Sequence, residues 1–343
     1  MEFAKYYTRI KEKSRYLKIT YLLFTGAFLL SGCSKHQSTE ENIKAPETGI
    51  YMEHPVGNTE PESAALAELE IELESEAESE WDLEPKTVTA DWSEYFNGLN
   101  GTAVLYDTSA RQYTLYNPDL ALTRSSPCST FKIISSLIAL ENGILEPTDF
   151  TRTWSGEVFW NEDWNRDIDF GEAFRTSCVW YYRQLVDDMG RDMMQEELNQ
   201  LWYGNCDISD WEGRLNTNNQ NRALTGFWIE SSLRISPKEQ VEVMERIFGG
   251  HSDYSMETQN ELKQVMLVSD QEKTDISIYG KTGMGKTDGI VVDAWFTGLV
   301  ETPKGNLYFC VRLGRTDDRN VSSALAKEIA IQIVADYYRN QTV

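Results

Sequence analysis

The sequence predicts an α+β fold, in which strands from the two ends of the folded region form one antiparallel sheet and a helical region is inserted between them. Residues 102–106 and 112–116 are strand-like and flank a polar turn, which is the pattern of a hairpin. Residues 274–279, 294–300 and 307–313 alternate with turn signals and predict further strands. Between these two groups, apolar residues recur at helical spacing.

The expected helices follow from this spacing and from their end signals. The first begins at Ser129 and is closed by Gly143, because glycine is the usual residue just past a helix end. In the last expected helix, Leu325, Ile329 and Ile333 recur at helical spacing. This last helix is expected at residues 322–338. The helices between the first and the last are expected at residues 170–189, 192–201, 237–248 and 256–268.

The first 33 residues have the pattern of an export signal. A run of Lys and Arg between residues 5 and 18 precedes the apolar stretch 19–30, which is too short for a comfortable membrane span. The stretch ends in Leu30-Ser31-Gly32-Cys33 and resembles a bacterial lipoprotein signal. We therefore expect residues 1–32 to be a signal peptide, and a lipid on Cys33 to anchor the protein on the outer face of the bacterial cytoplasmic membrane. The alternatives are a plain signal peptide and an uncleaved anchor.

Residues 33–91 are expected to be an acidic, flexible tether. No Lys or Arg lies between Lys44 and Lys86, and the acids of residues 68–76 alternate with other residues, so they share no helical face. The folded domain is expected to span residues 92–343. The formal net charge of −23 argues against a nucleic-acid partner, because the phosphate backbone is also anionic.

The candidate nucleophile is Ser129, which stands three residues before Lys132 at the start of an apolar run. On a helix this spacing places both side chains on one face. A serine hydroxyl needs a neighbouring base, and a lysine can serve as that base only when an apolar environment neutralises its ammonium. The simpler interpretation is an ordinary helix start with Ser129 as its N-cap.

A second element, Lys281-Thr282-Gly283, follows a strand-like run far downstream. A Ser-x-x-Lys motif paired with a later Lys-Thr-Gly is the signature of penicillin-recognising serine acyltransferases. Further motifs occur in the order typical of one family within this group. They are Ser177-Cys178-Val179, Tyr203-Gly204-Asn205, Trp228 before Leu233-Arg234-Ile235-Ser236, and Trp295-Phe296-Thr297-Gly298.

With these motifs, residues 92–343 resemble class D β-lactamases. The resemblance implies the serine β-lactamase and penicillin-binding transpeptidase fold, and it implies hydrolysis of the β-lactam ring through an acyl-enzyme on Ser129. It also implies that Lys132 reacts with CO2 to become N6-carboxylysine, the general base, with no other cofactor. Val179 would be an apolar wall of this site, Trp228 would donate its indole N–H to the carbamate, and Ser177 would relay a proton to the leaving nitrogen.

The resemblance also implies how the substrate is held. Lys281, Thr282 and Gly283 would bind the substrate carboxylate, and the backbone N–H groups of Ser129 and Met284 would form the oxyanion hole. Arg319, with Arg315 as its rival, would be a second contact to the carboxylate. The simpler interpretations are that Val179 belongs to the core, that the arginines are surface charges, and that Tyr203-Gly204-Asn205 is a structural turn.

Three functions remain open at this level. The leading hypothesis is a lipid-anchored β-lactamase that confers antibiotic resistance. The second is a β-lactam sensor or penicillin-binding domain that is acylated but turns over slowly, and the third is a cell-wall transpeptidase.

The interval between Tyr203 and Trp228 is long for the family that the chain resembles, which predicts a loop insertion beside the site.

The cysteines and histidines indicate no metal site. Four cysteines remain after Cys33, an even number that permits disulfides in an exported protein, but buried free thiols are the preferred interpretation. The chain has only three histidines, and no ligand spacing typical of a metal centre is present. The four cysteines are Cys128, Cys178, Cys206 and Cys310.

Overall fold

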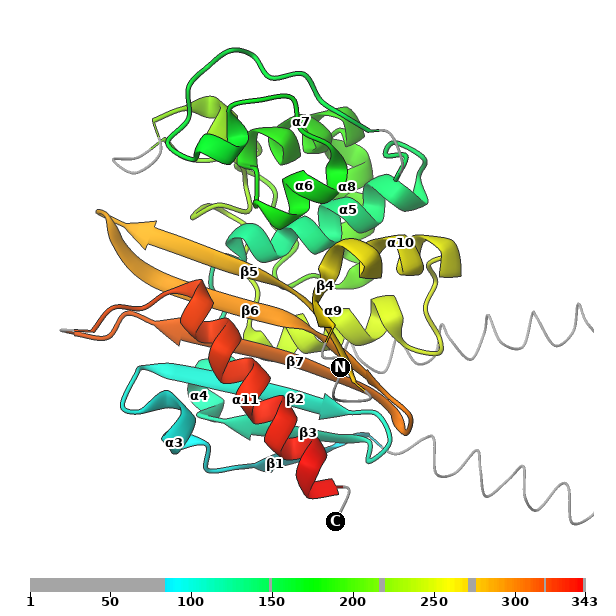
Figure 1. Ribbon diagram of the computed structural model, residues 1–343, viewed down its shortest axis with the longest axis vertical. Helices are drawn as coiled ribbons and strands as arrows, with labels where there is room; N and C mark the ends of the chain where they lie inside the picture. The colour runs from blue at the N-terminus through cyan, green and yellow to red at the C-terminus, as the bar shows by residue number, and fades with distance from the viewer. Residues whose placement is uncertain (1–83, 148–149, 216–219, 271–275, 318, 342–343) are drawn as a thin grey trace, which may run out of the picture. The chain divides into compact units, whose positions relative to one another are not determined.

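One seven-stranded sheet, in the order β1-β3-β2-β7-β6-β5-β4, is the centre of the computed structural model (Figure 1). The structure describes residues 84–147, 150–215, 220–270, 276–317 and 319–341, all of them in one unit of the chain. All neighbouring strands are antiparallel except β1 and β3, which are parallel. The strands are β1 (Lys86–Thr89), β2 (Gly101–Asp107), β3 (Gln112–Tyr116), β4 (Leu267–Asp270), β5 (Ser277–Thr287), β6 (Ile290–Thr302) and β7 (Gly305–Gly314).

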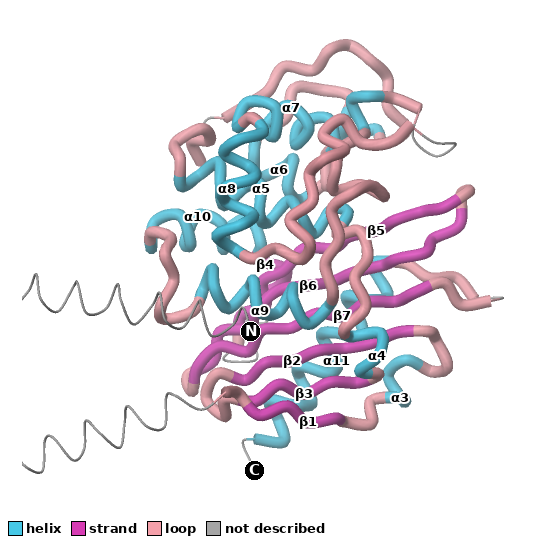
Figure 2. Tube along the Cα trace, turned by 180° about the vertical axis from the view of Figure 1, so that it is seen from behind, coloured by secondary structure: helices cyan, strands magenta, loops and turns pink. Residues whose placement is uncertain are grey.

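Helices cover both faces of this sheet. One face is crossed by α11, and the other carries α9 and the helical region (Figures 1 and 2). The helices are α3 (Ser93–Phe96), α4 (Pro118–Ala121), α5 (Lys132–Glu141), α6 (Phe170–Arg175), α7 (Val179–Met189), α8 (Arg191–Leu201), α9 (Pro237–Phe248), α10 (Met256–Met266) and α11 (Ser323–Gln341). None of these described helices is long and apolar enough to cross a membrane.

Two hydrophobic cores result from this layering. Successive side chains of a strand point to opposite faces, so Trp295 of β6 packs with the helical region while Phe296 packs with α11. On the α11 side, Ile329 and Ile333 are buried against the sheet, which confirms the helical spacing read from the sequence. The predicted α+β fold, with one sheet built from both ends of the folded region and helices inserted between them, is therefore confirmed.

The predicted elements differ from the structure in several places, and one is the helix expected at 256–268, which ends at Met266 because β4 begins at Leu267. The strand β1 lies before Trp92, because Lys86–Thr89 pairs with β3, so the sheet begins inside the segment expected to be tether. The expected helix 170–189 is interrupted after α6, where Ser177 adopts a φ of 59° that no α-helix accommodates. The motif Lys281-Thr282-Gly283 lies inside β5, which continues to Thr287, rather than at the end of a strand.

The other expected elements agree closely with the structure. The helix expected at 237–248 is α9, whose start is fixed by Pro237 and by a capping box between Ser236 and Glu239. The Tyr203-Gly204-Asn205 turn is structural, since Gly204 has a φ of 55° and a Cβ there would lie 2.0 Å from the Arg234 carbonyl oxygen. The signal peptide, Cys33 and the acidic stretch 68–76 lie outside the described residues.

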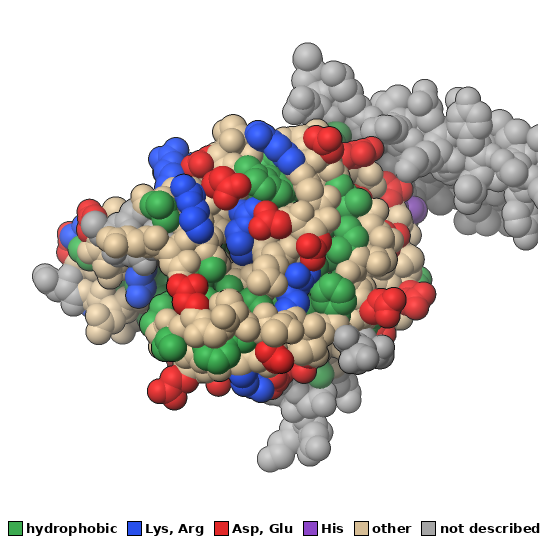
Figure 3. Space-filling view, turned by 90° about the horizontal axis from the view of Figure 1, so that it is seen from above, with side chains coloured by type: hydrophobic (Ala, Val, Ile, Leu, Met, Phe, Trp, Pro, Cys, Tyr) green, Lys and Arg blue, Asp and Glu red, His purple; other side chains and the backbone are tan. Residues whose placement is uncertain are grey.

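The surface of the described unit carries charges of both signs. In Figure 3, acidic and basic side chains lie side by side on the face that the helical region presents. Oppositely charged neighbours of this kind include Arg166 with Glu172 and Arg214 with Asp210. This face is therefore not a uniform acidic surface, although the whole chain has a formal charge of −23.

Candidate active site

Ser129 is the second residue of η1 (Cys128–Phe131), a single 3₁₀ turn that leads directly into α5. Backbone N–H groups in the first turn of a helix have no intrahelical acceptor, so they are available to a ligand. Cys128 has a φ of 50°, a conformation that non-glycine residues rarely adopt and that is concentrated at functional sites. This conformation is held by a hydrogen bond of 2.9 Å from the Cys128 N–H to the Trp228 carbonyl oxygen. Ser129 does not act as an N-cap, because neither η1 nor α5 has a side-chain cap.

Lys132, the first residue of α5, contacts the candidate nucleophile Ser129 directly. Its Nζ donates a hydrogen bond of 3.1 Å to Ser129 Oγ, and its side chain is 1% exposed. Burial lowers the pKa of Lys132 to about 8, because an apolar environment penalises the ammonium; the thiols of Cys178 and Cys128 oppose this shift. Roughly a tenth of this lysine is therefore neutral at pH 7, far more than for an exposed lysine, and a general base must be neutral.

The segment between α6 and α7 forms another side of the site. Ser177 Oγ is buried and has no hydrogen-bond partner among the described residues. The next residue, Cys178, is close enough for its thiol to influence the pKa of Lys132, and Val179 begins α7. One turn further along α7, the ring centroid of Tyr182 lies 5.0 Å from Lys132 Nζ. This interruption of the helix therefore brings an orphaned hydroxyl and an apolar helix start towards the Ser129–Lys132 pair.

Trp228 reaches the site through both its backbone and its ring. Its carbonyl oxygen accepts hydrogen bonds of 2.9 Å from the Cys128 N–H and from Ser126 Oγ. Its indole is 1% exposed and stacks on Phe131, the neighbour of Lys132, with ring centroids 5.7 Å apart. The segment around Trp228 therefore holds the nucleophile turn in place.

Strand β5 forms another side of the site and has an open edge there. Beyond Tyr279, β6 is the one strand of the described sheet that pairs with β5, so the other edge of β5 offers backbone groups to a ligand. Gly283 lies against the nucleophile turn, since a Cβ there would meet the Pro127 carbonyl oxygen at 2.9 Å. Met284, the second expected oxyanion donor, follows it and is 41% exposed. The contact between Gly283 and Pro127 confirms that the Ser129–Lys132 motif and the Lys281-Thr282-Gly283 motif lie together, although they are far apart in the sequence.

Lys281 is buried on the same strand, with 5% exposure. Its Nζ donates to the Thr282 carbonyl oxygen at 3.2 Å and lies 5.7 Å from the centroid of Phe174, three residues before Ser177. Burial, followed by the charge of Lys132, holds the pKa of Lys281 well below its ordinary value. Within the described residues, no carboxylate forms an ion pair with either lysine, so the site contains two buried amines and no counter-anion.

The two candidate arginines do not contact the other predicted site residues. Arg319 is exposed, and its Nη2 donates to the Asn97 carbonyl oxygen at 3.0 Å. Asn97 follows α3, which packs with α11, whereas Ser129 and Gly283 meet on the side of the helical region. Arg315 pairs with Asp317 at the surface. The structure gives neither arginine a contact with Ser129, Lys132 or Lys281.

A buried network of polar side chains lies beneath η1, the turn that carries Ser129, and was not predicted from the sequence. Arg312 of β7 and Asp293 of β6 are 7% and 6% exposed and form an ion pair. Asp293 also accepts a hydrogen bond from Ser125 Oγ, and Arg312 donates to the Thr123 carbonyl oxygen at 3.0 Å. The position of a residue along a strand predicts which face of the sheet its side chain lies on, but not which side chain it pairs with. This network could therefore not be predicted from the sequence. Tyr182 was detectable, because it stands three residues after Val179 on one helical face.

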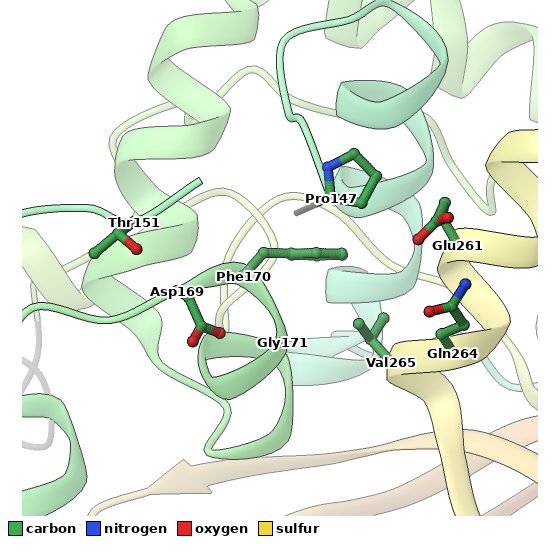
Figure 4. A pocket seen from close by; sticks show the side chains of 8 residues that line it. All are labelled: Pro147, Thr151, Asp169, Phe170, Gly171, Glu261, Gln264 and Val265. Carbon is green, nitrogen blue, oxygen red and sulfur yellow. The ribbon is translucent and has the colours of Figure 1, made fainter. Parts of the chain in front are cut away.

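A pocket of about 380 Å³ lies elsewhere, between the start of α6 and α10 (Figure 4). Its lining includes Asp169, Phe170, Glu261 and Val265, and none of the predicted site residues. The Asp169 carboxylate already caps α6 by accepting the Glu172 N–H at 2.8 Å. No serine, lysine or arginine lines it, so this pocket does not replace the site at Ser129.

The cysteines of the described region are all free. Cys128, Cys178 and Cys310 are buried, as expected, and Cys206 is half-buried. Burial raises the pKa of the Cys128 thiol to about 12 and that of Cys178 to about 11, so both remain protonated. No group of three or more His, Cys, Asp or Glu side chains in the described residues is arranged to hold a metal ion.

Comparison with known proteins agrees with this geometry. The family described as the penicillin binding protein transpeptidase domain matches residues 101–335. The probable β-lactamase YbxI of Bacillus subtilis is 34% identical over 71% of this chain and 82% of its own length. The regulatory protein BlaR1 of Bacillus licheniformis is 30% identical over 71% of this chain, which spans only 38% of BlaR1.

A solved structure extends the likeness to three dimensions. The class D β-lactamase of Bacillus subtilis has a TM-score of 0.63 at 31% identity, over 72% of this chain and 95% of that one. The resemblance read from the motifs is confirmed by these matches. The chain therefore belongs to the penicillin-binding-protein transpeptidase family, as a relative of class D β-lactamases and of BlaR1.

Proposed function

We propose that this protein hydrolyses β-lactams through an acyl-enzyme on Ser129. The observation that carries the proposal is the pair of buried amines without a counter-anion, one of them 3.1 Å from the serine hydroxyl. A site of this kind is suited to anions, and β-lactams carry a carboxylate beside the reactive ring. The similarity to YbxI and to a class D structure supports the same reaction.

Each residue has a defined task in this proposal. Ser129 Oγ gives its proton to the base at Lys132 as it attacks the ring carbonyl, and the ring C–N bond breaks as Ser177 relays a proton to the nitrogen. The backbone N–H groups of Ser129 and Met284 stabilise the oxyanion, a contribution of about 2.7–4 kcal/mol for each donor in comparable sites. Lys281 and Thr282 bind the substrate carboxylate at the open edge of β5. Water then releases the acyl group from Ser129.

The surroundings of Lys132 fit N-carboxylation. Reaction with CO2 needs a neutral amine, and burial lowers the pKa of Lys132 to about 8. When Lys132 carries CO2 as a carbamate, that group supplies the base for both acylation and deacylation. The Tyr182 ring lies beside the buried Lys132 side chain, and no carboxylate of the described residues competes for the amine.

The alternative is a β-lactam sensor, which is favoured by the similarity to BlaR1. Hydrolase and sensor share the acylation step and differ in whether the acyl group leaves. We favour the hydrolase because the residue that follows Cys178 at the start of α7, where the resemblance implies a wall of the lysine site, is the apolar Val179. A polar residue there would pair with the amine and hold it as an ammonium.

The proposal also covers where the protein works. We propose that a lipid on Cys33 anchors it to the outer face of the cytoplasmic membrane, where it would destroy β-lactams before they reach the cell wall and so confer resistance. Cys33→Ala should then release active protein from the membrane fraction. Retention of a processed Cys33→Ala protein in that fraction would rule the lipid anchor out.

Turnover of a chromogenic cephalosporin tests the proposal. The protein should hydrolyse many equivalents, and mass spectrometry should find one transient adduct on the peptide that carries Ser129. Ser129→Ala should lose both adduct and turnover, while Ser125→Ala, a serine that bonds to Asp293, should still acylate. An adduct on a different serine would contradict the assignment, and a single stable adduct without turnover would indicate the sensor.

A further inference from the structure

Arg183 is a buried charge on α7 that the proposed reaction does not use. Its side chain is 7% exposed, while that of its ion-pair partner Asp187 is 51% exposed. Nη1 donates a hydrogen bond of 2.9 Å to the Trp211 carbonyl oxygen, and Nε donates one of 3.0 Å to Asp187 Oδ2. A pair with one exposed partner contributes little by itself, so the ion pair does not explain why the guanidinium is buried.

The guanidinium is buried against two indoles. Its Cζ lies 5.4 Å from the ring centroid of Trp211 and 5.6 Å from that of Trp228. Contacts of a cation with an aromatic face are stronger when water is excluded, and a planar guanidinium also stacks on such faces. Trp228 is 1% exposed, so its contact with Arg183 is of the desolvated kind.

The same contacts link the Tyr203–Trp228 interval to the active site. Trp211, within this interval, stacks on Phe227 with centroids 5.2 Å apart, and Phe227 packs edge-on against Trp228 at 5.1 Å. Arg183 joins two members of this aromatic row, because it donates to the Trp211 carbonyl oxygen and lies over the ring of Trp228. The row ends at Phe131, which stacks on Trp228 and precedes Lys132.

We propose that Arg183 is a positioning residue that fixes the indole of Trp228 against Phe131, the residue that precedes Lys132. Its planar cation lies over the indole, and its hydrogen bond to Trp211 fixes the preceding segment. The consequence for deacylation rests on the proposed function, a carboxylated Lys132, and on the hydrogen bond that the Trp228 indole is expected to donate to it. The placement of the indole does not depend on that function and can be measured without it.

The test compares Arg183→Met with Arg152→Met in the full chain. Arg152 is a matched control, since it lies over the rings of Phe150 and Tyr181, pairs with Asp188 of α7, and has no contact with Trp228. The ¹⁵N–¹H indole resonance of Trp228, assigned by its absence in Trp228→Phe, should shift and broaden in Arg183→Met. It should stay in place in Arg152→Met, and Arg183→Lys should fall between.

Deacylation gives the second readout. Arg183→Met should raise the bicarbonate concentration needed for half-maximal deacylation by roughly tenfold to thirtyfold, the upper value being the full loss of a desolvated cation–π contact. Arg152→Met should leave it unchanged. An unmoved Trp228 resonance in Arg183→Met, or an equal shift in both variants, would overturn the proposal. A wild-type protein without bicarbonate dependence would instead refute the carboxylated lysine, and the indole resonance would still decide the role of Arg183.

Discussion

Lys132 and Lys281 are buried in one site from two distant parts of the chain, and the charge of Lys132 contributes to lowering the pKa of Lys281. Two ammonium groups in an apolar site repel each other and lack solvation, so burial favours the neutral amine at both positions. An anion that enters this site relieves that penalty. In the proposed function, this relationship would let one site favour both N-carboxylation of Lys132 and binding of an anionic substrate.

The first prediction concerns pH. Because burial lowers the pKa of Lys132 to about 8, the neutral amine is lost as pH falls below that value. At a fixed concentration of dissolved CO2, reactivation of CO2-depleted protein should therefore rise with pH and level off above about 8, falling by about tenfold for each pH unit below. Stopped-flow measurement of the reactivation rate checks this. A limb centred near pH 10, the ordinary range of lysine, would show that burial does not neutralise this amine.

The second prediction concerns the contact between the two motifs. A Cβ at Gly283 would lie 2.9 Å from the Pro127 carbonyl oxygen and 3.0 Å from Thr130 Cγ2, so Gly283→Ala must push β5 away from the nucleophile turn. Acylation should slow on the order of 10- to 100-fold, because small displacements of reacting groups have effects of this size. Gly250→Ala is the control, since nothing lies within 4 Å of its added Cβ. Equal acylation rates in the two variants would refute the close approach.

The third prediction concerns the network beneath the nucleophile. Asp293→Ala leaves the buried guanidinium of Arg312 without its carboxylate, which should reduce the free energy of unfolding by about 3–5 kcal/mol. Adding Arg312→Met should restore most of this loss, because no charge then stays uncompensated. Urea unfolding of both single variants and the double variant measures the coupling. Additive losses would mean that the two residues do not act as a pair.

The fourth prediction concerns the apolar start of α7. Val179→Asp places a carboxylate beside Cys178, whose thiol is close enough to affect Lys132. Pairing with this carboxylate should hold Lys132 as an ammonium and slow deacylation much more than acylation. Val179→Ala, which adds no charge, should keep bicarbonate-dependent turnover. If Val179→Asp deacylates like the wild type, the apolar wall is not needed.

Much of the fold was predictable because local patterns and packing agree. The start of α9, where Ser236 and Glu239 form a capping box, depends on residues close together in the chain. The apolar spacing of α11 is local in the same way, so sequence patterns predict both helices. The interruption between α6 and α7 was missed, because the left-handed conformation of Ser177 arises from tertiary packing. The strand β1 was missed for a similar reason, since its four residues are fixed by pairing with β3.

The site was predictable where a motif places two groups at a fixed spacing. Ser129 and Lys132 lie together as expected from three-residue spacing, and Lys281-Thr282-Gly283 meets them across the fold. Arg319 was chosen only by its order after the last strand, and chain order does not fix where a long exposed side chain points. Its guanidinium bonds to the Asn97 carbonyl oxygen instead.

The rate at which the acyl group leaves Ser129 tests the central claim most directly. After a brief pulse of penicillin, intact-protein mass spectrometry follows the adduct with bicarbonate present and after CO2 has been rigorously removed. The account predicts rapid loss of the adduct with bicarbonate, a persistent adduct without it, and recovery when bicarbonate is added back. An adduct that persists for hours under both conditions would contradict hydrolysis and identify a sensor, and equally rapid loss under both would contradict the carboxylated Lys132.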